Sequence, residues 1–446
     1  MTAPAAKAVP RQMTLLALIA ATYFMVAGGP FGLEDIVLRS GYAGAILILL
    51  ITPVIWSLPT ALMVSELASA IPEDGGYYVW VKRGMGNFWG YQEAWLSLVA
   101  SFFDMAIYPT LFVGYLGHLA PSVTANGRGF WIGVVLIAVT SFWNLLGSRI
   151  VGGSSVVMAI VMLSPFAILA MYALFQRNAG GGQSVPLSNV DFLGAIAVAM
   201  FNYMGFDDAS PIAGEVERPQ RTYPIAMAVT CILVAASYVL PIAAVSLTGL
   251  DANRWTPSSW ADIARTVFHN GAAGTVAAVA ITIGGMLGAA GTLNAFTMSY
   301  SRIPAVLADD GYLPRILSRR NAAGAPWVSI FGCSIIWALC LRLSFVELIL
   351  LDVLLKGLSV LLEFAALVAL RRREPEMHRP YRVPGGMTGA IAVGIPPTIL
   401  LILTAARTEN QPLGPINALE LSLILIAAGV VAYFIGAHVR KAKTTS

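Results

Sequence analysis

The feature of this sequence that most constrains its fold is a series of long apolar runs. Twelve of them match the roughly 20 residues that an α-helix needs to cross the core of a bilayer. Hydrophobic residues make up 57% of the 446 residues and charged residues 11%, which excludes a water-soluble fold of this length. The runs cover residues 14–37, 43–70, 88–117, 129–147, 151–175, 192–214, 223–248, 272–304, 326–342, 345–370, 388–406 and 417–437. We therefore expect an all-α membrane protein with twelve transmembrane helices in one domain, 1–446.

The basic residues between these runs predict an orientation in the membrane. With the N-terminus in the cytoplasm, 19 of the 27 Lys and Arg residues fall on the cytoplasmic side, as the positive-inside rule requires. We expect a multi-pass protein of the cell (cytoplasmic) membrane, surrounded by membrane lipid, with both termini cytoplasmic. The alternative, a cleaved signal peptide at the first run, would leave eleven spans and disturb this asymmetry. These loops also explain the net charge of +4, so no nucleic-acid partner is indicated.

The first run contains a stretch that cannot stay helical. Residues 26–35 read Val-Ala-Gly-Gly-Pro-Phe-Gly-Leu-Glu-Asp. Gly28, Gly29 and Gly32 lower the cost of irregular backbone, and Pro30 removes a backbone N–H. Inside a bilayer such a gap is tolerated only where protein or a water-filled cavity covers the exposed backbone. The stretch therefore indicates a binding site.

A second interruption of the same kind lies at residues 201–211, in the sixth run. Five runs separate the two points, so the two broken helices cross in opposite directions. This arrangement is typical of an inverted repeat whose paired discontinuous helices, here the first and sixth, form a site at the bilayer midplane. We expect repeats at about 12–175 and 190–371 and two extra helices at 388–437. Ordinary Gly or Pro kinks are the alternative.

The third run carries a polar stripe. Glu93, Ser97, Asp104 and Tyr108 recur at helical spacing on an otherwise apolar helix. Because a carboxylate near mid-membrane costs at least about 2.5 kcal/mol, Asp104 should face the bundle interior and have a partner. A structural hydrogen bond to a neighbouring helix is the alternative to a functional role for Asp104 and for Glu93.

The tenth run holds three further charged residues on one helical face, Asp352, Lys356 and Glu363. Asp352 and Lys356 are four residues apart and can neutralise each other. We therefore interpret them as a structural pair and not as a coupling site.

The acids at the two breaks select the charge of the ligand. Half-helices that begin at mid-membrane direct a positive dipole end into the cavity, which by itself suits a carboxylate. Here Glu34 and Asp35 open one half-helix, Asp207 and Asp208 open the other, and Asp104 adds a further negative charge. We infer an organic cation with two or more amines as the substrate. Helix capping is the alternative for some of these acids, above all for Glu34, Asp35 and Asp208.

The energy source predicted is a proton gradient. The sequence lacks the Gly-x-x-x-x-Gly-Lys motif of nucleotide-binding proteins, and carboxylates can carry protons when they are unpaired. The candidates for proton coupling are Asp104, Asp207 and Glu93. We expect no cofactor and no metal site. An enzyme is disfavoured because the four histidines fall near the ends of runs or in loops, and a channel because paired broken helices suit alternating access.

Several motifs resemble the amino acid-polyamine-organocation superfamily, whose fold is the LeuT-type five-plus-five inverted repeat. They are Phe201-x-Tyr203-x-Gly205-Phe206-Asp207, Gly214-Glu215-Val216-Glu217-Arg218-Pro219 and Ala308-Asp309-Asp310-Gly311. A second set looks more narrowly like the polyamine uptake transporters, which are proton symporters. It comprises residues 28–35, Trp56-Ser57-x-Pro59, Pro72-Glu73-Asp74-Gly75-Gly76-Tyr77, Gly90-Tyr91-Gln92-Glu93, Asp104 and Tyr108-Pro109.

The resemblance implies roles for individual positions. Gly28, Gly29, Phe31 and Gly32 would line the site, Phe201 would be an aromatic gate, Phe296 an aromatic wall, and Asp207 a substrate or proton contact. Tyr203-Met204-Gly205-Phe206 replaces the tryptophan-rich break of the polyamine carriers and is closer to general amino acid permeases. The loop 120–128 lacks the cysteine that links heteromeric exchangers to a heavy-chain subunit, so no such subunit is indicated.

These observations predict a secondary transporter that imports polyamines or related organic cations together with protons. Asp104, Tyr108 and Asp207 would hold the amines, Tyr203 would belong to the same site, and Phe201 and Phe296 would close over the methylene chain. A permease or exchanger for neutral or cationic amino acids is the alternative.

Overall fold

The computed structural model describes residues 12–176, 192–256, 259–343, 345–408, 412–413 and 416–445, and these residues are almost entirely helical. The first half contains α1 Leu15–Val26, α2 Glu34–Thr52, the π-helical turn η1 Pro53–Ser57, α3 Leu58–Ala70, α4 Gly76–Met85, α5 Asn87–Leu119, α6 Pro121–Thr124, α7 Arg128–Asn144 and α8 Ser148–Phe175. The second half contains α9 Phe192–Asn202, η3 Asp207–Glu215, α10 Pro219–Ser246, η4 Ala252–Arg254, α11 Trp260–Val267, α12 Ala272–Tyr300, α13 Arg302–Asp309, η5 Arg315–Ser318, α14 Trp327–Cys340 and α15 Phe345–Arg373. After these come α16 Gly386–Ala392, α17 Ile395–Thr408 and α18 Ala418–Thr445.

The helices confirm a multi-pass, all-α membrane protein. Among the described residues, eight helical stretches are long and apolar enough to cross a membrane, and three shorter apolar helices, α1, α7 and α14, accompany them. One small departure from an all-helical chain is an antiparallel pair of two-residue strands, β1 Pro412–Leu413 and β2 Ile416–Asn417. In it Leu413 pairs with Ile416.

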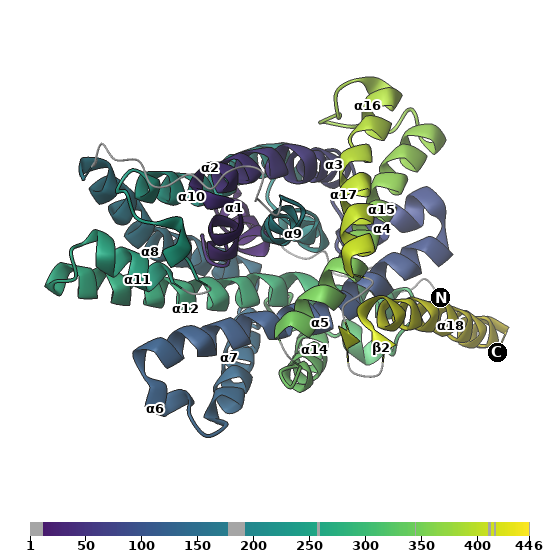
Figure 1. Ribbon diagram of the computed structural model, residues 1–446. Helices are drawn as coiled ribbons and strands as arrows, with labels where there is room; N and C mark the ends of the chain where they lie inside the picture. The colour runs from purple at the N-terminus through teal and green to yellow at the C-terminus, as the bar shows by residue number, and fades with distance from the viewer. Residues whose placement is uncertain are drawn as a thin grey trace.

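Helix α1 lies inside the bundle (Figure 1). It packs against α8, α10 and α12, and most of its residues are buried. A helix that is apolar all round fits this central position. The sequence after α1 therefore enters the middle of the protein.

The first break is present at the predicted place. Helix α1 ends at Val26 and α2 begins at Glu34. Gly29 has a φ of +93°, a conformation that side chains with a Cβ rarely adopt. The carbonyl of Pro30 accepts a hydrogen bond of 2.6 Å from the indole N–H of Trp260, so protein covers part of the exposed backbone, as the bilayer requires.

The second break directly contacts the first. Helix α9 ends at Asn202, and a 3₁₀-helix, η3, begins at Asp207. Between them Gly205 has a φ of +106°, and a Cβ placed on Gly205 would lie 2.2 Å from the carbonyl oxygen of Met25 in α1. The absence of a side chain at Gly205 therefore lets the two interrupted helices meet.

Candidate functional site

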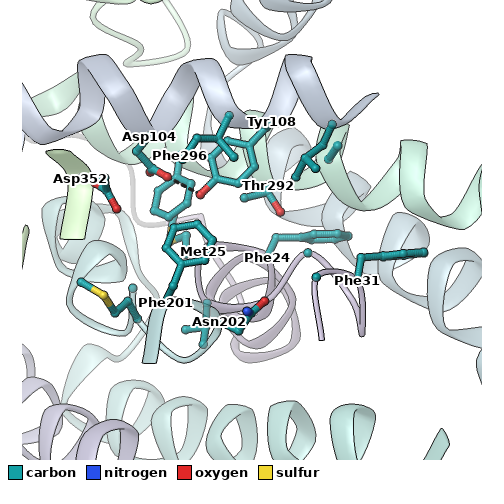
Figure 2. A pocket seen from close by; sticks show the side chains of 18 of the residues that line it. Phe24, Met25, Phe31, Asp104, Tyr108, Phe201, Asn202, Thr292, Phe296 and Asp352 are labelled. Atoms are coloured by element: carbon teal, nitrogen blue, oxygen red, sulfur yellow. Dashed lines mark hydrogen bonds between the residues drawn. The ribbon is translucent and has the colours of Figure 1, made fainter. Parts of the chain in front are cut away.

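A cavity of about 670 Å³ lies where the two breaks meet α5, α12 and α15 (Figure 2). Glycines and aromatic rings form much of its wall. The residues that line the cavity include Gly28, Phe31, Gly32, Glu34, Asp35, Arg39, Asp104, Tyr108, Phe201, Asp208, Phe296, Tyr300, Asp352 and Lys356. The volume suits a small organic molecule.

Asp104 faces the bundle interior and has two partners, as the sequence predicts. The hydroxyl of Tyr108 donates a 2.5 Å hydrogen bond to Oδ1 of Asp104, drawn in Figure 2, and the hydroxyl of Tyr300 donates one of 3.3 Å to Oδ2. Tyr108 stacks on Phe296 at 5.7 Å between ring centroids, and Phe296 stacks on Tyr300 at 5.0 Å. A carboxylate therefore sits beside a row of aromatic faces, a combination that binds alkylammonium groups.

The position of the Lys356 side chain contradicts the predicted pairing of Lys356 with Asp352. Its ammonium group lies 2.6 Å from Oδ2 of Asp207 and 2.5 Å from Oδ1 of Asp208, and it also faces the rings of Tyr77 and Tyr300. The expected pair with Asp352 is wrong. The i,i+4 spacing makes that pair available, but two carboxylates of the unwound η3 offer the buried ammonium a stronger field than one carboxylate of its own helix. Asp208 is consequently an ion-pair partner of Lys356, and η3 has no side-chain cap hydrogen bond at its start.

The charges that line the cavity do not balance. Five acids, Glu34, Asp35, Asp104, Asp208 and Asp352, stand against two basic residues, Arg39 and Lys356. Lys356 is already shared between two carboxylates, and Arg39 pairs with Asp35 at 2.6 Å. The cavity wall therefore holds more carboxyl groups than basic groups.

Of the residues predicted for the site, seven line the cavity: Gly28, Phe31, Gly32, Asp104, Tyr108, Phe201 and Phe296. Four others are not among its lining residues. Gly29 lies in the first break, and Asp207 pairs with Lys356. The buried Tyr203 donates a 2.7 Å hydrogen bond to the carbonyl of Leu49. Glu93 accepts hydrogen bonds from Ser97 and Ser359, and its Oε2 atom has no partner in the described part of the chain.

The cavity residues that sequence reasoning missed or misread include Tyr300, Asp352 and Lys356. Asp352 and Lys356 were singled out but assigned to each other. Ser359, a turn beyond Lys356 on the same face of α15, bonds to Glu93 and Ser97 of α5. The signal that could have placed Lys356 at the site is the presence of two adjacent acids, Asp207 and Asp208, at the second break.

The cavity reaches the surface at the N-terminal end of α2 and is closed at the opposite end. At the open end, the Asp35 and Arg39 side chains are 28% and 45% exposed. At the closed end, Arg302 and Glu215 form a 2.6 Å ion pair, and both side chains are 1% exposed. The backbone N–H groups of Gln12 and Met13 donate to the carbonyl of Glu215, so the N-terminal segment covers this closed end.

Two loop carboxylates near the closed end have shifted pKa values. Burial and the neighbouring Glu215 raise the pKa of Asp74, although the Arg320 guanidinium at 3.0 Å opposes this. Hydrogen bonds from Arg83 lower the pKa of Glu374. These pairs join α4 and its preceding loop to the ends of other helices.

Comparison with known sequences identifies the family. The sequence profile of the amino acid permeases matches residues 18–437. The chain belongs to the amino acid permease family. It is accordingly a multi-pass membrane protein of a transporter family and not an enzyme.

Several known transporters are similar in sequence to this chain over most of their own length. Polyamine transporter PUT1 of Oryza sativa subsp. japonica is 33% identical over 421 residues, which cover 93% of this chain and 78% of the relative. Polyamine transporter RMV1 of Arabidopsis thaliana is 30% identical over 429 residues, covering 94% and 84%. Serine/threonine exchanger SteT of Bacillus subtilis (strain 168) is 24% identical over 344 residues, covering 74% and 76%.

Proposed function

We propose that this protein is a secondary transporter that imports polyamines or related organic cations, coupled to protons. The observation that carries the proposal is the surplus of carboxylates in the cavity wall. A substrate with two or more ammonium groups would neutralise that charge, whereas an anion would increase the repulsion. The names of PUT1 and RMV1 point to the same substrate class.

The architecture proposed for this function is a LeuT-type fold of twelve transmembrane helices. The inverted repeats would cover about 12–175 and 190–371, with two extra helices at 388–437. The paired breaks at the cavity and the long apolar helices support it. Both termini would be cytoplasmic, in the cell membrane, so that the end closed by Glu215 and Arg302 faces the cytoplasm and the cavity opens outward.

Within the cavity, Asp104 and Tyr108 would hold an ammonium group, and Phe201 and Phe296 would cover the methylene chain. Gly28, Phe31 and Gly32, which line the cavity at the first break, would complete the wall. We propose Asp104, Asp207 and Glu93 as the candidates for the coupling proton, because each is buried in the bundle and near the cavity or Lys356.

The second candidate function is an amino acid permease or exchanger. The observation that favours it is the sequence Tyr203-Met204-Gly205-Phe206 at the second break, together with the similarity to SteT. The two candidates differ in the charge of the substrate, because an amino acid brings a carboxylate into a wall that already carries negative charge.

Uptake by purified protein in proteoliposomes tests the proposal. Radiolabelled putrescine should accumulate when the outside is acidified, spermidine should compete with it, and a proton ionophore should abolish the accumulation. Asp262→Asn, at α11, provides a control for surface charge and should transport normally. If putrescine is not transported and an amino acid accumulates without competition from polyamines, the proposal is wrong.

A further inference from the structure

Asp352 of α15 is a carboxylate in the cavity wall that forms no ion pair within the described part of the chain. Its residue is 5% exposed, and its Oδ1 atom has no hydrogen-bond partner among the described residues. Figure 2 shows its side chain entering the pocket beside Asp104, and the two carboxylates are close enough to repel each other. An ionised carboxylate buried without a partner is costly, so this position calls for a cation.

The neighbouring acids are already engaged. Asp104 accepts hydrogen bonds from Tyr108 and Tyr300, and Asp208 pairs with Lys356. Lys356 lies one turn from Asp352 on the same helix, but its ammonium group is held by η3. The ammonium group of Lys356 therefore forms its ion pairs with η3 and not with Asp352.

From this geometry we infer that Asp352 is a substrate-binding residue: it accepts a hydrogen bond from a terminal ammonium group of the substrate, and Asp104 receives another from the same group. The inference rests on the proposed function. A primary ammonium has three N–H donors, enough for both carboxylates. The rings of Tyr108 and Phe296 beside Asp104 would then face the adjacent methylene groups.

This assignment also gives Asp352 a role in specificity. An α-amino acid carries its carboxylate one carbon from its ammonium group, so its anionic end would lie against Asp104 and Asp352. A diamine has only methylene groups there. The pair of acids would therefore favour amines without a nearby carboxylate.

The test measures putrescine affinity by ligand-induced thermal stabilisation of the purified, full-length protein. For Asp352→Asn we expect the Kd for putrescine to rise at least about tenfold, because a hydrogen bond to a charged group is lost. The matched control is Glu363→Gln, on the same helix. Glu363 is also fully buried and its carboxyl oxygens have no hydrogen-bond partner among the described residues, but it does not line the cavity. The Kd of the Glu363→Gln variant for putrescine should change less than about twofold.

A conservative variant covers the case in which Asp352→Asn does not fold. Asp352→Glu keeps the charge but extends the carboxyl into the cavity, so the preference should move from longer diamines, such as cadaverine, towards shorter ones. If the wild type binds putrescine and neither Asp352 variant changes affinity or chain-length preference, the inference is overturned while the proposed function stands. Equal weakening by Glu363→Gln would also overturn it. If the wild type binds no diamine, both the inference about Asp352 and the proposed function are wrong.

Discussion

At the scale of single residues, Asp104 is the predictable part of the site. A carboxylate in the middle of an apolar helix must have a partner, and the structure supplies two tyrosine hydroxyls. The partner of Lys356 could not be predicted in the same way. Asp208 is 148 residues distant in sequence, and helical spacing compares only residues of one helix.

Asp104→Asn should separate the two candidate substrate classes. The amide keeps the shape but removes the charge, so the KM for putrescine should rise at least about tenfold. Transport of any zwitterion that the wild type accepts should be spared. Tyr108→Phe is the companion variant: it removes one hydroxyl from Asp104 but keeps the stacked ring, and should have a smaller effect. Equal loss of diamine and zwitterion transport in Asp104→Asn would indicate a role in folding or coupling instead.

At the scale of elements, the structure depends on how the two breaks are held together. Their positions were visible in the sequence because glycine and proline interrupt apolar runs. Their direct contact was not, since it requires knowing that Gly205 approaches the end of α1. That η3 is a 3₁₀-helix fixed to α15 through Lys356 also arises from tertiary contacts.

Lys356→Met should destabilise the protein strongly. The methionine keeps the apolar stem but leaves Asp207 and Asp208 buried together without a cation, and breaking a buried pair costs about 3–5 kcal/mol. We expect a clear drop in the thermal unfolding midpoint in detergent. The control is Lys82→Met, because Lys82 pairs with Asp310 at a partly exposed site, where an ion pair contributes about 0–1 kcal/mol. Similar midpoints for the two variants would contradict the role assigned to Lys356.

Gly205→Ala should disrupt the meeting of the two breaks. An alanine in this left-handed region costs roughly 1–2 kcal/mol for the backbone alone, and its Cβ would collide with the carbonyl of Met25. We expect a lower unfolding midpoint and lost uptake. Gly153→Ala in α8 is the control, because a Cβ at Gly153 meets nothing within 4 Å. If Gly205→Ala transports as well as Gly153→Ala, the breaks do not need this contact.

At the scale of the whole molecule, the cavity is open at one end and closed at the other. Apolar runs and basic loops were enough to predict a multi-pass helical protein. The closed end was not predictable, because Glu215, Arg302 and Met13 come from three distant parts of the chain. Transport would require this closure to open while the end that is now open closes.

Arg302→Gln should open the closed end of the cavity more often, since it breaks a buried ion pair. A cysteine placed at Thr292, in the cavity wall, reports this in a background without the three native cysteines. Labelling of this cysteine by a membrane-impermeant thiol reagent, applied on the side of the closed end, should speed up at least about tenfold. Arg83→Gln, which breaks a more exposed pair with Glu374, should change the rate little. Unchanged labelling in Arg302→Gln would show that this pair does not hold the end closed.

The most direct test of the account is an experimental structure of the purified protein with spermidine bound. We expect the ligand between the two breaks, with an ammonium nitrogen within about 2.7–3.2 Å of an oxygen of Asp104 and the methylene chain against Phe296. Residues 28–32 should remain non-helical. A ligand bound elsewhere, or a continuous helix through residues 28–32, would contradict the claim that two unwound helices form a cation site.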